Sequence, residues 1–277
     1  MNMSDKKTEI KTFVFLDIET TGLPREEYNK TKITELCMVA VEAAHIKGER
    51  TPRVQNKLNL CFNPAKMVSL GVKKAQVNTI DCIDCLAQRS LLRLSNFSLE
   101  NQEKFSSDTV NILNSFLNRN KKPLCFVAHN GNIFDYPILR AEIEKVRGSL
   151  LDNILCIDSI IMFRELHDEA ERQNVQGSDT EETTQGPSSS SPDKRERLSF
   201  QLRDIYVRLT NKRCPNEQEH RAESDVAMLL ESVLKLGDNF STWTNAHATR
   251  FYDIPAMAPG RILAHSFCEE ITHPSST

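Results

Sequence analysis

The chain has 277 residues, which is enough for one large domain or two small ones. Apolar residues make up 39% and charged residues 26%, a composition that supports a folded core and excludes a wholly disordered chain. The longest apolar runs, such as residues 36–41, fall far short of the roughly 20 residues of a membrane span, so we expect no membrane anchor. The net charge of −3 does not favour strong overall attraction to nucleic acid, although it leaves room for a local basic rim.

The cysteines and the N-terminal residues indicate a reducing compartment. The chain begins with charged residues and no apolar signal core, and its eight cysteines are scattered. Most of them lie in apolar stretches, where a free thiol packs as a small hydrophobe. Cys82 and Cys85 form a single CxxC pair without a second pair or a histidine close in sequence, which favours ordinary packing over a zinc site. We therefore expect an intracellular protein, located in the nucleus, the cytoplasm or both.

Strand patterns come first along the chain. Residues 12–16 form a continuous apolar run, which is typical of a central strand buried on both faces. Residues 33–44 form a second candidate, and residues 54–62 alternate polar and apolar side chains like a half-exposed strand that ends before Pro64. Two short apolar runs follow much later, at residues 124–128 and 154–157. Three early strands and two late strands interleaved with helices predict a mixed α/β domain.

Helical periodicity and one long polar stretch complete the expected organisation. The helical patterns cover residues 107–117, 136–146, 159–169, 198–209 and 222–236. From His167 to Lys194 the sequence is almost free of large apolar residues and rich in Ser, Thr, Glu and Gln. Such a stretch buries too little surface to offset its ordering entropy. We predict one domain over residues 10–255, with a disordered internal loop at about 168–194 and a flexible tail over 256–277.

The motif FLDIETTG places two acids at the end of the first strand. Asp17 and Glu19 are two residues apart, which puts both carboxylates on one face of a strand. Two such carboxylates repel each other unless a cation lies between them, and a hard divalent ion such as Mg²⁺ suits their oxygens. Taken alone, the DxE pattern is common, and two exposed loop acids explain it more simply.

Two further acids and a histidine favour a metal site over two exposed loop acids. Asp135 follows the turn HNGN and opens a helix, where it could also serve as an N-cap. Asp225 lies in the first turns of an amphipathic helix on its sheet-facing side, where an unpaired carboxylate is costly. His220 is five residues earlier and off that face, so we place it on the loop before the helix, where it could act as a general base. Together these residues favour a metal site with an adjacent base.

This set of motifs resembles the DEDDh 3′→5′ exonucleases of the ribonuclease H-like superfamily, and more closely the three-prime repair exonuclease family. The phrases DIETTGLP, ITELCMVAV, VAHNGNIFDYPILRAEI, CIDSI, IYVRL and WTNAHATRF carry the closer resemblance, from about residue 12 to about residue 254 outside the polar stretch. The resemblance implies an α/β, ribonuclease H-like fold. Its mixed five-stranded sheet would be a three-strand meander plus two parallel strands, flanked by helices.

The resemblance also implies roles for the site residues. The four acids would hold two Mg²⁺ ions, for which Mn²⁺ could substitute, and His220 would activate water. Glu19 and Asp225 would also touch the substrate. The metal set is Asp17, Glu19, Asp135 and Asp225.

Substrate contacts are implied for residues outside the acid set. Thr20 would contact the terminal nucleotide, and Leu23 would wedge against the last bases. Phe134 occupies a place that is commonly tyrosine in the family, so it keeps the ring and lacks the hydroxyl. Ile133 stands where a basic residue is often found. Basic residues that would touch the DNA backbone are Lys194, Arg195 and Arg197.

The function implied is removal of 5′-mononucleotides from DNA 3′ ends by a metal-dependent 3′→5′ exonuclease that prefers single-stranded or frayed ends. The resemblance also implies a homodimer, for which residues 54–62 offer an edge strand. An RNA-trimming exonuclease of the same superfamily is the alternative, because the site chemistry is shared. A non-catalytic nucleic-acid-binding scaffold is disfavoured because none of the four acids is missing.

Overall fold

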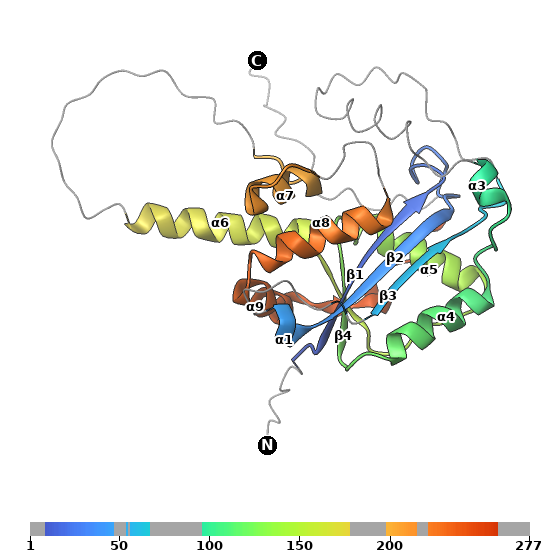
Figure 1. Cartoon of the computed structure of the whole chain (residues 1–277), viewed down its shortest axis with the longest axis horizontal. Helices are drawn as coiled ribbons and strands as arrows, with labels where there is room; N and C mark the ends of the chain where they lie inside the picture. Colours follow the sequence, from blue (N-terminus) through green and yellow to red (C-terminus); the bar gives the residue numbers. More distant parts are fainter. Residues whose placement is uncertain are drawn as a thin grey trace, which may run out of the picture.

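The computed structural model describes residues 9–46, 54, 56–66, 96–177, 198–214 and 221–259. Within them, one six-stranded mixed sheet forms the centre of the domain, with strand order β3-β2-β1-β4-β5-β6 (Figure 1). The strands are β1 (Thr12–Thr20), β2 (Ile33–Glu42), β3 (Asn56–Cys61), β4 (Leu124–Ala128), β5 (Leu155–Asp158) and β6 (Thr249–Arg250). The mixed α/β prediction is confirmed, and the predicted count of five was one strand short.

The sheet combines both pairing directions. β1, β2 and β3 form an antiparallel meander, whereas β1, β4 and β5 are parallel, and the connection from β4 to β5 contains α5. The additional strand, β6, is two residues long and pairs antiparallel with β5. So short a strand carries no periodic pattern in the sequence.

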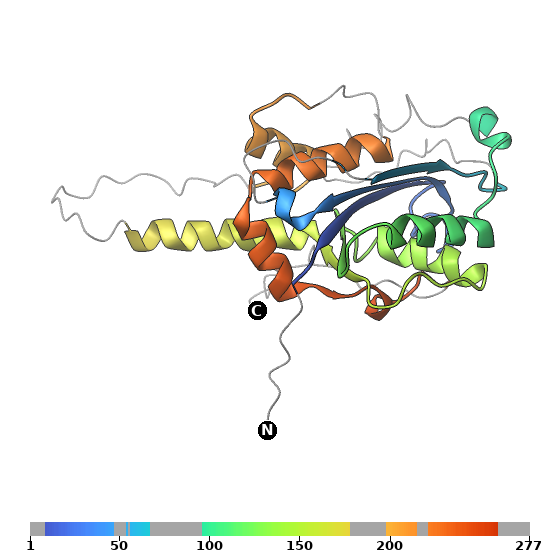
Figure 2. The ribbon, with the colours of Figure 1, turned by 60° about the horizontal axis from the view of Figure 1, so that its bottom comes forward.

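Helices cover both faces of the sheet. Figure 2 shows α4 and α5 on one side of the strands and α7 and α8 on the other. The helices are α1 (Ala43–Ile46), α3 (Asn96–Glu100), α4 (Ser107–Asn118), α5 (Asp135–Lys145), α6 (Ser159–Gly177), α7 (Leu202–Thr210), α8 (Ala222–Leu234), α9 (Asp238–His247) and the short 3₁₀ helix η1 (Phe251–Asp253). None of these helices is both long enough and apolar enough to cross a lipid bilayer.

Two parts of the predicted organisation need correction. α6 continues to Gly177, so residues 168–177 are helical and do not belong to a disordered loop. Residues 256–259 are not a free tail, because Met257 is buried and its N–H donates to the carbonyl of Pro137 at 2.8 Å. The rest of the predicted loop, residues 178–194, and the rest of the predicted tail lie outside the described residues.

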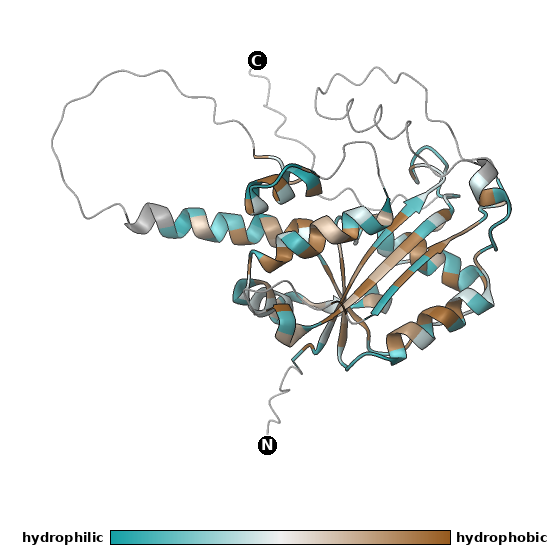
Figure 3. Cartoon of the chain, in the orientation of Figure 1, coloured by the Kyte–Doolittle hydropathy of each residue, from teal (hydrophilic) through white to brown (hydrophobic). Residues whose placement is uncertain are grey.

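The strand period of two divides the core into two halves. Val14 and Leu16 point into a cluster with α4 and α5, whereas Phe13 and Phe15 point into a cluster with α8 and α9. The ring of Phe13 packs 4.6 Å from that of Phe240 on α9. Figure 3 shows mainly hydrophobic strands between helices that carry both hydrophobic and hydrophilic residues. β1 is therefore the strand on which both layers are built.

Three cysteines of the sheet pack as apolar side chains, as predicted. Cys37, Cys125 and Cys156 are buried, and burial raises the pKa of Cys37 and of Cys156 to about 12. Such thiols stay protonated at neutral pH. Cys82 and Cys85 lie outside the described residues.

Candidate metal and catalytic site

The site begins on β1, beyond its apolar run. The strand extends to Thr20, so Asp17 and Glu19 lie within it and not in the loop that follows. They have the parity of Phe13 and Phe15, which places both carboxylates on the face covered by α8. The prediction that the two acids share a face is confirmed.

α8 brings the third acid to this face. The helix packs on β1 and β2 through Val226 and Leu229, which are buried in the same core half as Phe15. Asp225 lies in its first turn, where the positive end of the helix dipole favours a carboxylate. One carboxylate oxygen each of Asp17, Glu19 and Asp225 lies within 4.8 Å of the other two. The fold thus gathers three of the four predicted acids into one cluster.

Asp135 approaches β1 from the other side of the cluster. β4 pairs with β1 only as far as Phe15, so the backbone of Ile18 has no strand partner on that edge. The Ile18 N–H, between Asp17 and Glu19, donates to Oδ1 of Asp135 at 3.1 Å. Asp135 is buried at the first position of α5, so the prediction that it opens a helix is confirmed. It is close enough to raise the pKa of Asp17.

Burial and like charge together disfavour ionisation of these acids. Burial raises the pKa of Asp17 well above its usual value, and Asp225, Asp135 and Glu19 raise it further. Burial likewise raises the pKa of Asp135, against a lowering contribution from the Ile18 hydrogen bond. A divalent cation among the carboxylates would reverse this cost, and an all-oxygen donor set suits a hard cation. The residues present therefore fit a bound metal ion.

Glu35 is a buried acid that the sequence reasoning missed. It lies opposite Glu19 in the β1–β2 register and is 4% exposed. Burial raises its pKa, whereas the nearby Asn59 side chain and Ala222 backbone lower it. Ala222 is the first residue of α8, so Glu35 lies near the start of the helix that carries Asp225. The sequence could have identified Glu35 as a buried acid, because it is the one acid inside the apolar run ITELCMVAV.

Asp158 is a second missed acid, and it shapes the HNGN turn. Its Oδ1 accepts the N–H of Asn130 at 2.9 Å and of Ile160 at 3.0 Å, and its Oδ2 accepts the N–H of Asn132 at 3.1 Å. The side chain is buried at the end of β5. These bonds hold the turn that leads into α5 and therefore fix where Asp135 begins.

His129 joins the same turn to the segment before α7. The carbonyl of Phe200 can only accept, so Nε2 of His129 donates to it at 3.1 Å and Nδ1 accepts from Oγ of Ser159 at 2.9 Å. Burial lowers the pKa of His129 to about 4, against a raising contribution from the Phe200 hydrogen bond. The ring is therefore neutral at physiological pH and has a structural role.

The remaining predicted residues divide into two groups. Thr20, Leu23 and Phe134 are half-buried around the site; Oγ1 of Thr20 donates to the carbonyl of Gly22 at 2.9 Å, and Phe134 packs against the core. The predicted general base and the predicted backbone contacts lie outside the described residues: His220, Lys194, Arg195 and Arg197.

Comparison with solved structures places the fold among the exonucleases. The chain matches E. coli exonuclease I in a complex with single-stranded DNA, with a TM-score of 0.55 and 12% identity over 86% of this chain and 43% of that one. An exonuclease I from Methylocaldum szegediense gives a TM-score of 0.54 with 11% identity. The chain thus spans less than half the length of these structures, and the likeness concerns the fold alone.

Comparison with curated proteins is closer. No family model matches the chain. It is 31% identical over 260 residues to Three-prime repair exonuclease 1 of Bos taurus, covering 90% of this chain and 70% of that protein. It is 28% identical to Three prime repair exonuclease 2 of Mus musculus, covering 89% of this chain and 92% of that protein. With its acids gathered on the exonuclease fold, the chain belongs to the three-prime repair exonuclease family.

Proposed function

We propose that the chain is a metal-dependent 3′→5′ exodeoxyribonuclease that releases 5′-mononucleotides and acts through a single catalytic domain, which comprises residues 10–255 together with the packed residues 256–259. The observation that carries the proposal is the convergence of Asp17, Glu19 and Asp225, with Asp135 alongside, in a chain of this family. DNA is the proposed substrate because the structural neighbour E. coli exonuclease I is seen with single-stranded DNA.

The acids would hold two Mg²⁺ ions, or Mn²⁺ in their place. Such ions polarise a phosphodiester and lower the pKa of bound water. Asp17 and Asp225 come from different elements and repel each other. A bound cation would relieve this repulsion, which favours cation binding by the cluster. Asp135, held by the Ile18 N–H, has a fixed orientation. His220 would accept the proton of the attacking water as general base.

Substrate contacts are proposed around the end of β1. Thr20 and Glu19 would meet the terminal nucleotide, Leu23 would wedge against the last bases, and the ring of Phe134 would pack on the nucleotide. Lys194, Arg195 and Arg197 would contact the DNA backbone. A wedge at this point favours single-stranded and frayed ends over paired ends.

A homodimer through β3 is part of the proposal. β3 is an edge strand of the described sheet, and its side chains alternate between half-buried and exposed. Its free backbone edge could pair with the same edge of a second copy. We propose an intracellular location, in the nucleus, the cytoplasm or both.

The substrate test is digestion of 3′-labelled single-stranded DNA, duplex DNA and RNA side by side in Mg²⁺. We expect single-stranded DNA to be degraded fastest, with 5′-mononucleotides as products. Faster digestion of RNA would favour an exoribonuclease, and absence of digestion with retained binding would favour a scaffold.

The metal-site test is Asp225→Asn in the same assay. Removing one ligand charge should reduce hydrolysis by about 10³-fold or more, because the ions supply most of the charge stabilisation. The matched control is Asp238→Asn, which changes an acid in the first turn of α9 and should retain full activity. Near-normal turnover by Asp225→Asn would refute the assignment.

The base test is His220→Ala in single-turnover cleavage measured against pH. Loss of a general base should slow the chemical step by about 10²- to 10⁴-fold. The wild-type rate should rise through the histidine titration, since only the neutral ring accepts a proton, and the variant should lack that rise. An unchanged profile would assign water activation to the metals alone.

A further inference from the structure

The loop between β1 and β2 begins directly after the site. It covers residues 21–32, and its two ends are joined by hydrogen bonds from the Thr21 N–H to the Lys32 carbonyl, at 3.0 Å, and from the Lys32 N–H to Oγ1 of Thr21, at 3.1 Å. None of its apolar side chains is fully buried. A cleft of about 510 Å³, bordered by Lys32, Lys66 and α5, lies against it. Polar contacts, not apolar packing, therefore set its shape.

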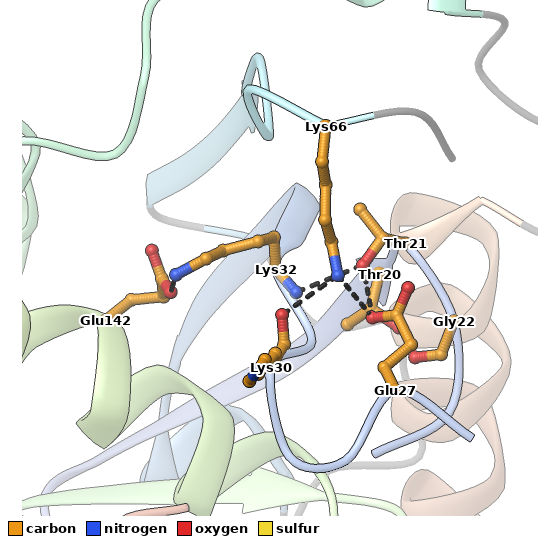
Figure 4. Close-up of polar contacts among 8 residues, drawn as sticks. All are labelled: Thr20, Thr21, Gly22, Glu27, Lys30, Lys32, Lys66 and Glu142. Carbon is orange, nitrogen blue, oxygen red and sulfur yellow. Dashed lines mark hydrogen bonds and ion pairs between the residues drawn. The ribbon is translucent and has the colours of Figure 1, made fainter. Parts of the chain in front are cut away.

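One carboxylate joins three parts of this region. Oε2 of Glu27 accepts Oγ1–H of Thr21 at 2.6 Å and Nζ of Lys66 at 2.7 Å, and the same Nζ donates to the Lys30 carbonyl at 2.9 Å. Figure 4 shows Lys66 reaching from the segment after β3 to this group. The Glu27 side chain is only 14% exposed, so the ion pair is partly shielded from solvent. We call these contacts the Glu27–Lys66 clamp.

Tyr28 stands between two anchored residues. Glu27 is held by the clamp, and Nδ2 of Asn29 donates to the carbonyl of Ala258 at 3.0 Å. Tyr28 and Asn29 both have left-handed backbones, with φ of 54° and 56°, a conformation that is rare for an aromatic residue and persists only where neighbours enforce it. At 81% exposure, Tyr28 is far more exposed than any other large hydrophobic side chain among the described residues.

We propose that Tyr28 is a stacking platform for an unpaired base of the DNA strand, presented to the strand by the Glu27–Lys66 clamp. A flat ring that an anchored backbone presents to solvent offers its faces to a nucleobase, and every base has a face that can stack on it. Arg25 and Lys30 are exposed on the same loop and supply positive charge for the strand's phosphates, against one exposed carboxylate, Glu26. The proposal rests on the proposed function for the identity of its ligand.

The direct test is Tyr28→Ala in steady-state digestion of a long single-stranded DNA. We expect KM to rise about fivefold to a hundredfold, the usual effect of removing one stacking ring, with kcat unchanged. Tyr28→Phe should match the wild type, because stacking needs the ring and not the hydroxyl. The matched control is Ile112→Ala on α4, which removes another exposed large side chain, 46% exposed, and should leave KM unchanged. An unchanged KM in Tyr28→Ala overturns the proposal.

Comparing a short and a long substrate distinguishes loss of stacking at Tyr28 from damage to the catalytic site. For a dinucleotide, which is too short to reach a platform outside the terminal site, Tyr28→Ala should behave like the wild type. An equal rise in KM for dinucleotide and long strand would place the effect at the terminal site and overturn the proposal. If the wild type cleaves no nucleic acid, the proposed function fails, and equilibrium binding of a DNA oligonucleotide in EDTA still tests Tyr28.

The clamp is tested by a double-mutant cycle. Glu27→Gln removes the charge facing Lys66 while keeping an acceptor for Thr21, and it should raise KM by less than Tyr28→Ala does. In the Tyr28→Ala background it should add nothing, since the platform it positions is gone. Independent, multiplicative effects on KM would show that the clamp does not act through Tyr28.

Discussion

Asp17 shows how a position on the central strand can favour function over stability. Its neighbours on the same face of β1 are Phe13 and Phe15, both fully buried, yet the chain places a carboxylate next in that series. Burial and four nearby acids raise its pKa. A carboxyl group in such surroundings destabilises the metal-free fold when it is ionised.

Asp17→Asn should therefore stabilise the metal-free protein. In EDTA at pH 8 we expect the free energy of unfolding to rise by about 1–2 kcal/mol, because the amide removes a buried charge at nearly constant shape. In Mg²⁺ the wild type should gain thermal stability and the variant should gain less. Denaturant unfolding with and without Mg²⁺ measures both effects. A variant less stable than the wild type in EDTA would contradict this account.

His129 makes the stability of the fold depend on pH through a lowered pKa, whereas the pKa of Asp17 is raised. Its pKa is about 4 in the folded protein and near 6.5 in an unfolded chain, so the unfolded state binds more protons between these values. Stability contributed by the neutral ring is complete above about pH 6.5 and is lost as the pH falls towards 4, by about 2–3 kcal/mol.

His129→Gln should flatten that dependence. The amide can donate to the Phe200 carbonyl and accept from Ser159 without titrating. Unfolding free energies at pH 4.5 and pH 7 should differ less in the variant than in the wild type, and this comparison cancels the contribution of the acids. An equal difference in both proteins would remove His129 as the source.

At the scale of elements, the HNGN turn decides where α5 and its acid begin. A Cβ on Gly131 would lie 2.7 Å from the ring of Tyr136 and 2.8 Å from Cβ of Ala128, so the turn packs directly on the helix that it starts. The Tyr136 hydroxyl is itself fixed by donating to the Ile157 carbonyl at 2.6 Å. The ring therefore has little freedom to make room.

Gly131→Ala should consequently destabilise the fold by about 1–3 kcal/mol and lower hydrolysis by displacing Asp135. The control is Gly237→Ala, where a Cβ meets nothing within 4 Å and only the positive φ of 55° is strained. It should cost about 1 kcal/mol and leave hydrolysis unchanged. Thermal melts and digestion rates distinguish the two variants, and full activity in Gly131→Ala would show that the turn can shift without moving the acid.

For the whole molecule, the features that could be predicted from the sequence are those that follow from the spacing of apolar residues. The strand period places Asp17 and Glu19 on one face, and the apolar runs locate the first five strands. α6 was predicted too short because the side chains of residues 168–173 are exposed, so no apolar stripe marks this part of the helix. Asp158 acts by accepting backbone N–H groups of the HNGN turn, and such contacts leave no periodic trace in a sequence.

The position of β1 beneath α8 also has a consequence for folding kinetics. Asp17 and Asp225 come from opposite ends of the described chain and meet only when α8 docks on the sheet. Closing so long a loop is a late and slow step in a fold with non-local contacts. During refolding, the spectroscopic signals of strands and helices should therefore recover before cation binding and hydrolysis. The rate at which activity returns then reports the rate at which α8 docks on the sheet.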